Sequence, residues 1–397
     1  MVQPNTEGFL DSVREVCSQV WGQEALEGSE IETKHLTLGI TNQLFAVFVK
    51  PKKQGASPKS MLIRIFGAEG IIDRSIENAL FASLAAVGIA PGYLGRFANG
   101  RCEEFLDGWA NLGNADIRKP NISRVVAAKL AEVHAFSVPP PLQKHFDSTC
   151  SGVWSQLGSW IDVLEKTPVQ DEAIADSLNQ FYDKYFGGTG FPTLRARVKQ
   201  LQEMAPKDAQ IVFSHNDLLA FNIMRRCSNV TEGQDGVDDA ETEARSNPSG
   251  ASRDEELGLS DIKLIDYEYG CYNYRGFDVA NHFCEWAGGS DDAKPLYEHF
   301  PTPEQQRLFC ESYIDACAAL GIQSRDRVKL DSSDSELEQA ESELDKLLRE
   351  VSFFVQVVHI YWTVWALNQA RDEGIEGFDY ISYAHRRFSE GLRRRTM

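Results

Sequence analysis

The feature that most limits how this chain of 397 residues can fold is a change in the spacing of its apolar residues. In the N-terminal part, apolar and β-branched runs bounded by Gly and Pro predict strands over Thr37–Val49 and Ser60–Phe66. The strong helix formers of Glu77–Ala86 predict one helix. Two shorter strands are expected around Tyr93–Phe97 and Cys102–Leu106. This part of the chain therefore predicts a small sheet with one prominent helix.

Beyond Ile122 the apolar residues recur mainly at helical spacing. The expected helices cover Ser123–Phe136, Val153–Leu164, Glu172–Tyr185, Arg195–Met204, Pro303–Leu320 and Leu347–Arg371, and short strands are expected at Ala209–Phe213 and Ile262–Ile265. A strand-rich front and a helix-rich back predict an α+β, bilobal fold. We expect an N-terminal lobe over residues 1–106 and a C-terminal lobe over residues 107–397, with the hinge near Glu103–Gly108.

The net charge of −19 is concentrated in two low-complexity segments, at about 228–260 and 331–346. Ten acidic residues stand against two arginines between Thr231 and Asp261, and seven stand against one lysine between Asp331 and Lys346. We predict that both segments are insertions, the first of them disordered because it lacks the apolar surface that would offset its ordering entropy. The second is expected to be either a loop or the acidic start of a helix.

The rest of the chain is only mildly acidic and contains no basic stripe. Proteins that bind nucleic acid or an anionic membrane surface need such a stripe, so neither partner is expected. An acidic field weakly favours a cationic substrate.

The eight cysteines are scattered and form no CxxC pair, a pattern typical of reduced thiols rather than a disulfide framework. The first residues, MVQPNTEGFLDSVREVC, contain no apolar core of the kind that a signal peptide needs. No uninterrupted apolar run approaches the roughly 18–20 residues of a spanning helix. We therefore expect a cytoplasmic protein without a membrane span, and the sequence leaves open a homodimer.

The residues most indicative of chemistry are Ser214–Asn222, which follow a short expected strand, and Ile265–Glu268, which follow another. In phosphoryl transfer, an Asp in a tight loop orients the acceptor hydroxyl, an Asn five residues later binds Mg²⁺, and an Asp at a strand end bridges metal and phosphates. Asp217, Asn222 and Asp266 match this pattern, and their oxygens suit Mg²⁺. Alone, the first motif could be a polar turn; the second motif makes that alternative a poor one.

These motifs resemble those of a known family. HNDLLAFNI and IDYEYGCYNYRGFDVANHFCEW resemble the paired signatures of the choline/ethanolamine kinase family, which has a protein-kinase-like fold. GITNQLF resembles the nucleotide-covering loop of that family, MLIRIFG its second strand, CEEFL its hinge, and YWTVWALNQA its substrate-pocket helix. The resemblance covers about Leu38 to Leu392, apart from the two acidic segments. It implies ATP as the co-substrate and Mg²⁺ as the cofactor.

The resemblance also implies roles for single residues. Asp217 would be the catalytic base, Asn222 and Asp266 would hold Mg²⁺, and His215 would belong to the catalytic loop as a brace rather than a base. Arg64 would contact the phosphates and pair with the helix residue Glu77. The residues expected at the nucleotide are Thr41, Asn42, Gln43, Arg64, Glu77, Glu104 and Leu106, the last two through their backbone.

The expected acceptor pocket combines aromatic rings with carboxylates. Trp362 and Trp365 share a helix face, and Tyr383 lies on a later helical segment, so all three could attract a cation. Periodicity alone would assign the two tryptophans to the core of an apolar helix; the resemblance favours the pocket. Glu285 would supply a counter-charge. Glu268, on a strand-like stretch, would point the same way as Asp266 and support the site.

The acceptor itself is a finer question. Choline cannot donate N–H hydrogen bonds and depends on an aromatic cage, whereas ethanolamine donates three. A tyrosine is expected shortly after HFCEW in choline kinases, but this chain has Ala287-Gly288-Gly289-Ser290. The resemblance thus implies phosphorylation of ethanolamine to phosphoethanolamine, feeding phosphatidylethanolamine synthesis. The alternatives are a choline kinase and a dual choline/ethanolamine kinase. More distant alternatives are an aminoglycoside-type phosphotransferase and a non-catalytic pseudokinase scaffold.

Overall fold

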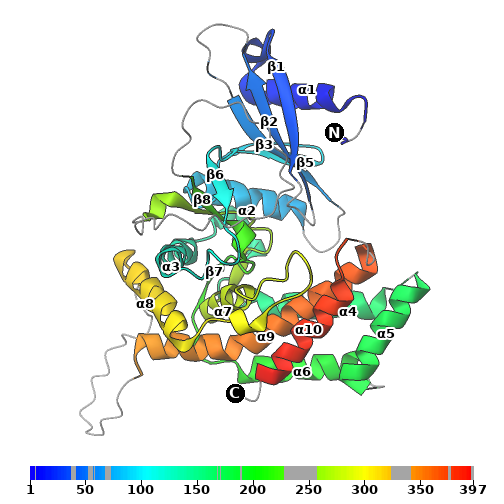
Figure 1. Cartoon of the computed structure of the whole chain (residues 1–397), viewed down its shortest axis with the longest axis vertical. Helices are drawn as coiled ribbons and strands as arrows, with labels where there is room; N and C mark the ends of the chain where they lie inside the picture. Colours follow the sequence, from blue (N-terminus) through cyan, green and yellow to red (C-terminus); the bar gives the residue numbers. More distant parts are fainter. Residues whose placement is uncertain are drawn as a thin grey trace, which may run out of the picture.

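A computed structural model of the chain shows a small, strand-rich lobe above a large helical lobe (Figure 1). The structure describes residues 1–4, 6–36, 42–51, 57, 59–67, 73–167, 169, 171–187, 190–227, 257–322, 341–373 and 377–394. Most of both acidic segments, and Thr41 of the expected nucleotide loop, lie outside the described residues.

The N-terminal lobe contains a five-stranded antiparallel sheet with the strand order β1-β2-β3-β5-β4. Its strands are β1 (Glu30–Leu36), β2 (Asn42–Lys50), β3 (Lys59–Phe66), β4 (Tyr93–Phe97) and β5 (Gly100–Glu103). Helix α1 (Phe9–Trp21) packs its apolar side against this sheet, with Val13 and Cys17 in one buried cluster with Val47 and Ile63. The sequence pattern did not predict α1 or β1, and the strand predicted over Cys102–Leu106 is wrong beyond Glu103.

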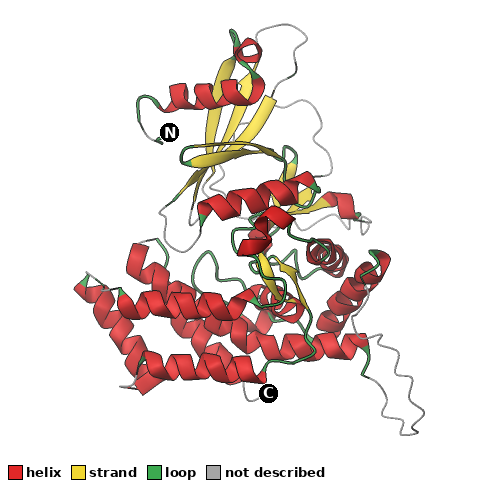
Figure 2. Ribbon diagram, turned by 180° about the vertical axis from the view of Figure 1, so that it is seen from behind, coloured by secondary structure: helices red, strands yellow, loops and turns green. Residues whose placement is uncertain are grey.

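Helix α2 (Arg74–Ala86) lies between the sheet and the helical lobe (Figure 2). Asp73 caps its first turn by accepting hydrogen bonds from the backbone N–H groups of Ser75 and Ile76. Leu80, Phe81 and Leu84 are buried in the larger apolar cluster, which extends through the C-terminal lobe. The helix therefore connects the two lobes through packing as well as through the chain.

The C-terminal lobe is built around α9 (Glu343–Glu373). The surrounding helices are α3 (Pro120–His134), α4 (Gly152–Lys166), α5 (Glu172–Phe186), α6 (Phe191–Met204), α7 (Arg275–Glu285), α8 (Pro303–Ala319) and α10 (Tyr380–Arg394). Among the described residues, Glu343–Asp372 is the one helix long and apolar enough to cross a membrane, but 83% of its most apolar window is buried inside the fold. Burial between α7, α4 and α10 accounts for its composition.

Two small sheets stand where the lobes meet. One pairs β7 (Ile211–Ser214) with β10 (Cys271–Tyr274), and the other has the order β6-β8-β9, with β6 (Trp109–Asn111), β8 (Ile223–Arg226) and β9 (Ile262–Leu264). Short strands of this kind act as rigid supports for the loops at their ends. The two predicted short strands are confirmed as β7 and β9, and the loops that follow them carry the motif residues.

Candidate active site

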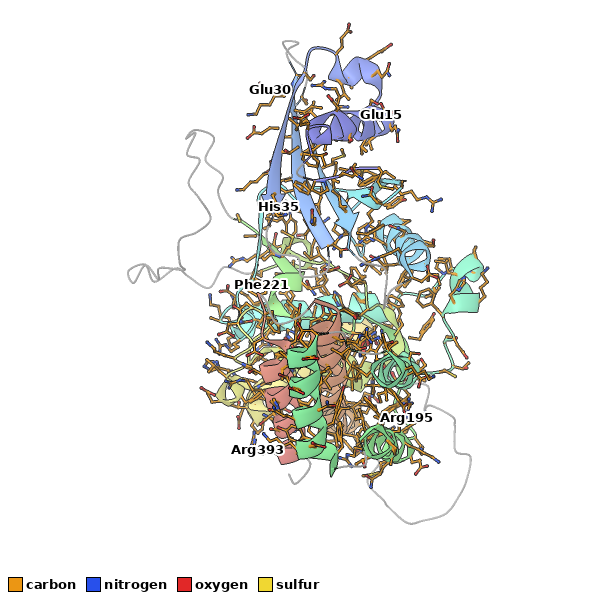
Figure 3. The ribbon with its side chains drawn as sticks, turned by 90° about the vertical axis from the view of Figure 1, so that its right-hand side faces the viewer. Glu15, Glu30, His35, Arg195, Phe221 and Arg393 are labelled. Atoms are coloured by element: carbon orange, nitrogen blue, oxygen red, sulfur yellow. The ribbon has the colours of Figure 1, made fainter. Side chains whose placement is uncertain are left out.

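The two motifs meet because β8 and β9 pair antiparallel. Ile223 lies opposite Leu264, and the backbone N–H of Ile265 donates to the carbonyl of Asn222 over 2.9 Å. The loop between β7 and β8 therefore lies beside the segment that follows β9. Figure 3 labels Phe221 in this loop, at the level where the sheet of the N-terminal lobe meets the helices below.

Asp217 and Asn222 are in direct contact. The Asn222 amide Nδ2 donates to Asp217 Oδ2 over 3.1 Å and to the Asp217 carbonyl over 2.8 Å. Burial raises the pKa of Asp217 well above its ordinary value, and the carboxylates of Glu285, Asp266 and Glu268 raise it further. The side chain is thus a strong proton acceptor whenever it is ionised, as a hydroxyl-activating group needs to be.

Asp266 has a left-handed backbone conformation, with φ of 64°. A non-glycine residue in this region is strained, and such strain concentrates at functional sites. The Asp266 carboxylate keeps 27% of its side-chain surface exposed, and its Oδ1 lies 3.3 Å from Arg64 Nη1. Because Asp266 also raises the pKa of the nearby Asp217, the site gathers negative charge with an accessible carboxylate. That donor set fits a hard divalent cation such as Mg²⁺.

Both ring nitrogens of His215 form hydrogen bonds with the backbone. Its Nε2–H donates to the Ile265 carbonyl over 2.9 Å, and its Nδ1 accepts the backbone N–H of Asp217 at 3.3 Å. Burial lowers its pKa, so the ring is neutral. Both ring nitrogens therefore have partners in the structure, an arrangement that suits a brace of the loop.

Asp278 was not predicted, yet it holds the catalytic loop. This fully buried carboxylate accepts the backbone N–H groups of His215 (2.7 Å) and Asn216 (2.8 Å), and it contacts His134 Nε2 at 3.0 Å. Burial opposes ionisation, but the His134 hydrogen bond and the loop N–H groups keep its pKa below the ordinary value. The signal in the sequence was the Asp that ends the RGFD run, two residues after Gly276.

His282 braces the loop from α7 and makes stability depend on pH. Its Nδ1–H donates to the Leu218 carbonyl at 2.9 Å, and its Nε2 accepts from Trp286 Nε1 at 3.2 Å. A second ring proton would face the Trp286 N–H, and burial lowers the pKa of His282 to about 4. Between that value and the ordinary 6.5, the unfolded chain binds a proton that the folded chain refuses, so stability falls as the pH falls.

We expect His282 alone to remove up to about 3 kcal/mol of unfolding free energy between pH 7 and pH 4. Urea unfolding across this range measures the slope. His282→Gln should flatten it, whereas the control His145→Asn, at an exposed position, should keep it. An unchanged slope in His282→Gln would contradict the assignment.

The direct pair between Arg64 and Glu77 is not formed, so that prediction is wrong. Arg64 Nε instead donates to Glu103 Oε1 at 2.8 Å, and Glu77 contacts Arg101 at 2.5 Å and Arg74 at 3.0 Å. The pattern missed Arg101 and Glu103, although their alternate positions on a strand place both on one face. Burial would lower the pKa of Arg64, but the carboxylates of Asp266 and Glu103 raise it overall.

The other expected nucleotide residues lie in β2 or directly after β5. Asn42, at the start of β2, is buried, and its Nδ2 lies 3.4 Å from Glu268 Oε2; Gln43 beside it is exposed. The backbone N–H of Glu104 donates to the Gly92 carbonyl at 2.7 Å. The backbone of Glu104 therefore has only its own carbonyl left for a hydrogen bond with an adenine ring. Leu106 is buried at the lobe junction. These positions remain predictions for nucleotide contacts.

Two of the three predicted pocket aromatics are in direct contact. Trp362 and Trp365 meet edge to face, with ring centroids 5.5 Å apart. Their indole N–H groups are fixed, that of Trp362 by Asn281 Oδ1 at 2.7 Å and that of Trp365 by the Tyr269 hydroxyl at 2.9 Å. Tyr269, which was not predicted, therefore links the DYEY motif to this aromatic cluster.

The two predicted pocket carboxylates have protein partners. Glu285 pairs with the fully buried Arg387, whose Nε also donates to the Tyr383 hydroxyl at 2.8 Å. Glu268 lies in a turn, whereas a strand-like stretch was predicted. Its Oε2 lies 3.3 Å from Arg74 Nη1. Burial and Asp266 raise the pKa of Glu268 to about 7 against the lowering effect of Arg64 and Arg74.

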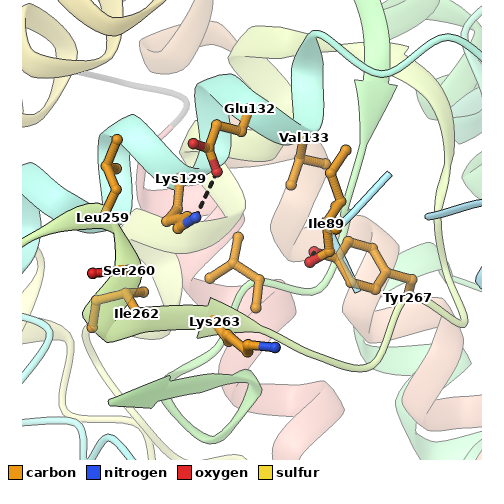
Figure 4. Close-up of a pocket in the computed structure, with 11 residues that line it drawn as sticks. Ile89, Lys129, Glu132, Val133, Leu259, Ser260, Ile262, Lys263 and Tyr267 are labelled. Carbon is orange, nitrogen blue, oxygen red and sulfur yellow. Dashed lines mark hydrogen bonds and ion pairs between the residues drawn. The ribbon is translucent and has the colours of Figure 1, made fainter. Parts of the chain in front are cut away.

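Tyr267, between Asp266 and Glu268, points away from the site. It lines a small cavity with Ile89, Lys129 and Val133, as Figure 4 shows. Its hydroxyl donates to the Ile89 carbonyl at 3.4 Å, and its ring lies 4.7 Å from that of His215. The tyrosine anchors the segment to the core, which leaves the two flanking carboxylates on the side of the N-terminal lobe.

Comparisons with known proteins agree with this geometry. A family model described as choline/ethanolamine kinase matches residues 33–391. The chain is 27% identical over 396 residues to probable choline kinase 3 of Arabidopsis thaliana (98% of this chain, 94% of the relative), and 28% identical over 388 residues to probable ethanolamine kinase of the same plant (96% and 84%). Its structure is similar to that of an ethanolamine kinase of Plasmodium vivax, with a TM-score of 0.69 at 24% identity (98% of this chain, 89% of the other). The protein-kinase-like fold is confirmed.

Proposed function

Since the chain belongs to the choline/ethanolamine kinase family, we propose that its preferred acceptor is ethanolamine, which it converts into phosphoethanolamine. Members of this family are ATP-dependent phosphotransferases with an alcohol acceptor, and this activity extends to the present chain. The family match over most of the chain displaces the aminoglycoside-type alternative. We place the reaction in the cytoplasm, upstream of phosphatidylethanolamine synthesis.

One observation carries the choice of ethanolamine: the turn after α7 consists of small residues in conformations that exclude a large side chain. Gly288 and Gly289 have φ of 65° and 86°. A Cβ at Gly289 would lie 2.4 Å from the backbone nitrogen of Pro295, so even alanine would require the turn to move. This turn therefore adds no ring to the cage on which choline depends.

The proposed transfer assigns one task to each polar group. Asp217 accepts the proton of the ethanolamine hydroxyl as that oxygen attacks the γ-phosphorus of ATP, and ADP leaves. Asn222 and Asp266 would hold Mg²⁺, which neutralises charge on the phosphates. Arg64, beside Asp266, would contact the same phosphates. The substrate ammonium is favoured by the excess of carboxylates that raises the pKa of Asp217.

Steady-state kinetics with the two amino alcohols test the preference. We expect kcat/KM for ethanolamine to exceed that for choline by roughly tenfold or more, equivalent to about 1.4 kcal/mol. The assay would follow ADP release at fixed Mg²⁺ and ATP. A higher kcat/KM for choline would reject ethanolamine as the preferred acceptor while leaving the kinase activity standing.

The aromatic cluster should matter more to choline than to ethanolamine. Trp365→Leu keeps an apolar side chain but removes the ring, so we expect KM for choline to rise several-fold more than KM for ethanolamine, because cation–π attraction amounts to about 1–2 kcal/mol. Trp21→Leu, in the distant α1, is the matched control and should change neither KM. Equal increases for both amines in Trp365→Leu would show that this ring does not discriminate between them.

A further inference from the structure

A row of charged side chains of alternating sign joins Asp266 to Glu268 through the N-terminal lobe. Each contact lies between 2.5 and 3.3 Å. In order, the row contains Asp266, Arg64, Glu103, Arg101, Glu77, Arg74 and Glu268. Both ends belong to one short segment of the C-terminal lobe, so the row, which we call the charge ladder, forms a closed loop across the lobe junction.

The ladder is buried almost throughout. Apart from Asp266, every member keeps 10% or less of its side-chain surface exposed. Buried ion pairs need close, hydrogen-bonded geometry, and the loss of one partner leaves an unpaired charge that the neighbours must accommodate. A substitution of one residue of the charge ladder is therefore expected to shift the other residues of the ladder as well.

Arg101 is the central residue of the charge ladder and joins the part that ends at Asp266 to the part that ends at Glu268. Its Nε lies 2.7 Å from Glu103 Oε1, the same oxygen that Arg64 contacts, and its Nη1 lies 2.5 Å from Glu77 Oε1. The guanidinium also stacks over the Phe81 ring, 4.2 Å from its centroid, and the side chain has no exposed surface. The planar fork of arginine can hold two carboxylates in fixed directions, which a lysine cannot do.

We propose that Arg101 is a positioning residue: through the charge ladder it fixes Asp266 and Glu268 relative to each other and to α2, and so sets the geometry of the metal site. Arg101 itself contacts neither Asp217 nor Asp266 in the described structure. It acts through Glu103 and Arg64 on one side and through Glu77 and Arg74 on the other. The inference rests on the proposed function, because it takes Asp266 to be a ligand of Mg²⁺.

Arg101→Lys is the main test, because it keeps the charge and removes the fork. We expect the Mg²⁺ concentration that gives half the maximal rate to rise at least several-fold and kcat to fall, while KM for ethanolamine stays unchanged. A second readout needs no turnover: Mn²⁺ binding in the presence of a non-hydrolysable ATP analogue, followed by electron paramagnetic resonance, should weaken by a similar factor.

Arg275→Lys is the matched control. Arg275 is also a buried arginine shared by two glutamates, with its Nε 3.0 Å from Glu350 Oε2, but it lies at the start of α7 and outside the ladder. It should lower stability about as much as Arg101→Lys and leave the Mn²⁺ affinity unchanged. If the two variants behave alike in Mn²⁺ binding, Arg101 is only structural and the inference fails.

A double-mutant comparison guards against misfolding of the main variant. Arg74→Lys, at the less buried end of the ladder, should weaken Mn²⁺ binding by itself. Combined with Arg101→Lys it should add little, because both variants break the same connection. Fully additive effects would overturn the proposal. A wild-type protein that consumes no ATP with either amine would instead reject the proposed function.

Discussion

Asp217→Asn is expected to lower kcat by roughly 10²–10⁴-fold, the usual contribution of a positioned general base. The amide matches the carboxylate in shape, and its oxygen can still accept the hydrogen bond that Asn222 Nδ2 donates to Oδ2. It cannot accept the proton of the ethanolamine hydroxyl. ATP affinity should therefore be retained while turnover is lost, as measured by nucleotide titration and by ADP release.

The same substitution should raise the melting temperature. Burial and three neighbouring carboxylates raise the pKa of Asp217, so its ionised form destabilises the folded state at neutral pH. A neutral amide removes the free-energy cost of this buried charge. We therefore expect the variant to lose activity and to gain stability. Asp315→Asn, at an exposed position of α8, should change neither. Unchanged kcat in Asp217→Asn would contradict its assigned role.

Asp266→Asn is expected to lower kcat by roughly 100-fold or more, equivalent to about 2.7 kcal/mol of the barrier. The amide removes the accessible negative charge that the site offers to Mg²⁺. Arg64 keeps its contact with Glu103, so the fold should survive. Raising the Mg²⁺ concentration should restore part of the lost rate, because the variant binds the metal weakly rather than reacting by another route.

Asp208→Asn is the control for this second variant. It also removes a carboxylate paired with an arginine, Arg349 at 2.7 Å, but at the surface of the C-terminal lobe. We expect it to keep the wild-type rate and the wild-type Mg²⁺ dependence. If Asp266→Asn slowed the reaction with no change in that dependence, Asp266 would have a role other than metal binding.

The fold was predictable where periodicity is strong. The helices α4, α5 and α8 begin within a residue of the predicted positions. The buried residues of α4 and α5 recur at helical spacing, and the side chains of Asp171 and Thr302 cap the first turns of α5 and α8. Helix α7 was not predicted, although Arg275, Asp278 and Glu285 in RGFDVANHFCE recur at helical spacing. Every residue of the helix is buried, so this polar side faces other parts of the protein rather than solvent. Helix α9 begins at Glu343, inside the second acidic segment, where acidic residues suit a first helical turn.

The candidate site was predictable to the extent that motifs encode it. Asp217, Asn222 and Asp266 come together because neighbouring strands deliver their loops, and spacing after those strands is visible in a sequence. A sequence does not show which buried charged residues pair with each other. Which arginine faces Glu77, or that Arg387 neutralises Glu285, depends on the packing of elements far apart in the chain. For that reason the ladder and the Glu285 pair appeared only in the structure.

The most direct test of the central claim, that Asp217, Asn222 and Asp266 act together on magnesium–ATP beside a small amino alcohol, is ³¹P nuclear magnetic resonance of the purified protein with ATP, ethanolamine and Mg²⁺. We expect the γ-phosphate signal to be replaced, mole for mole, by the phosphomonoester signal of phosphoethanolamine, and we expect chelation of Mg²⁺ to stop the conversion. Unchanged ATP with both ethanolamine and choline, or release of inorganic phosphate alone, would contradict the account.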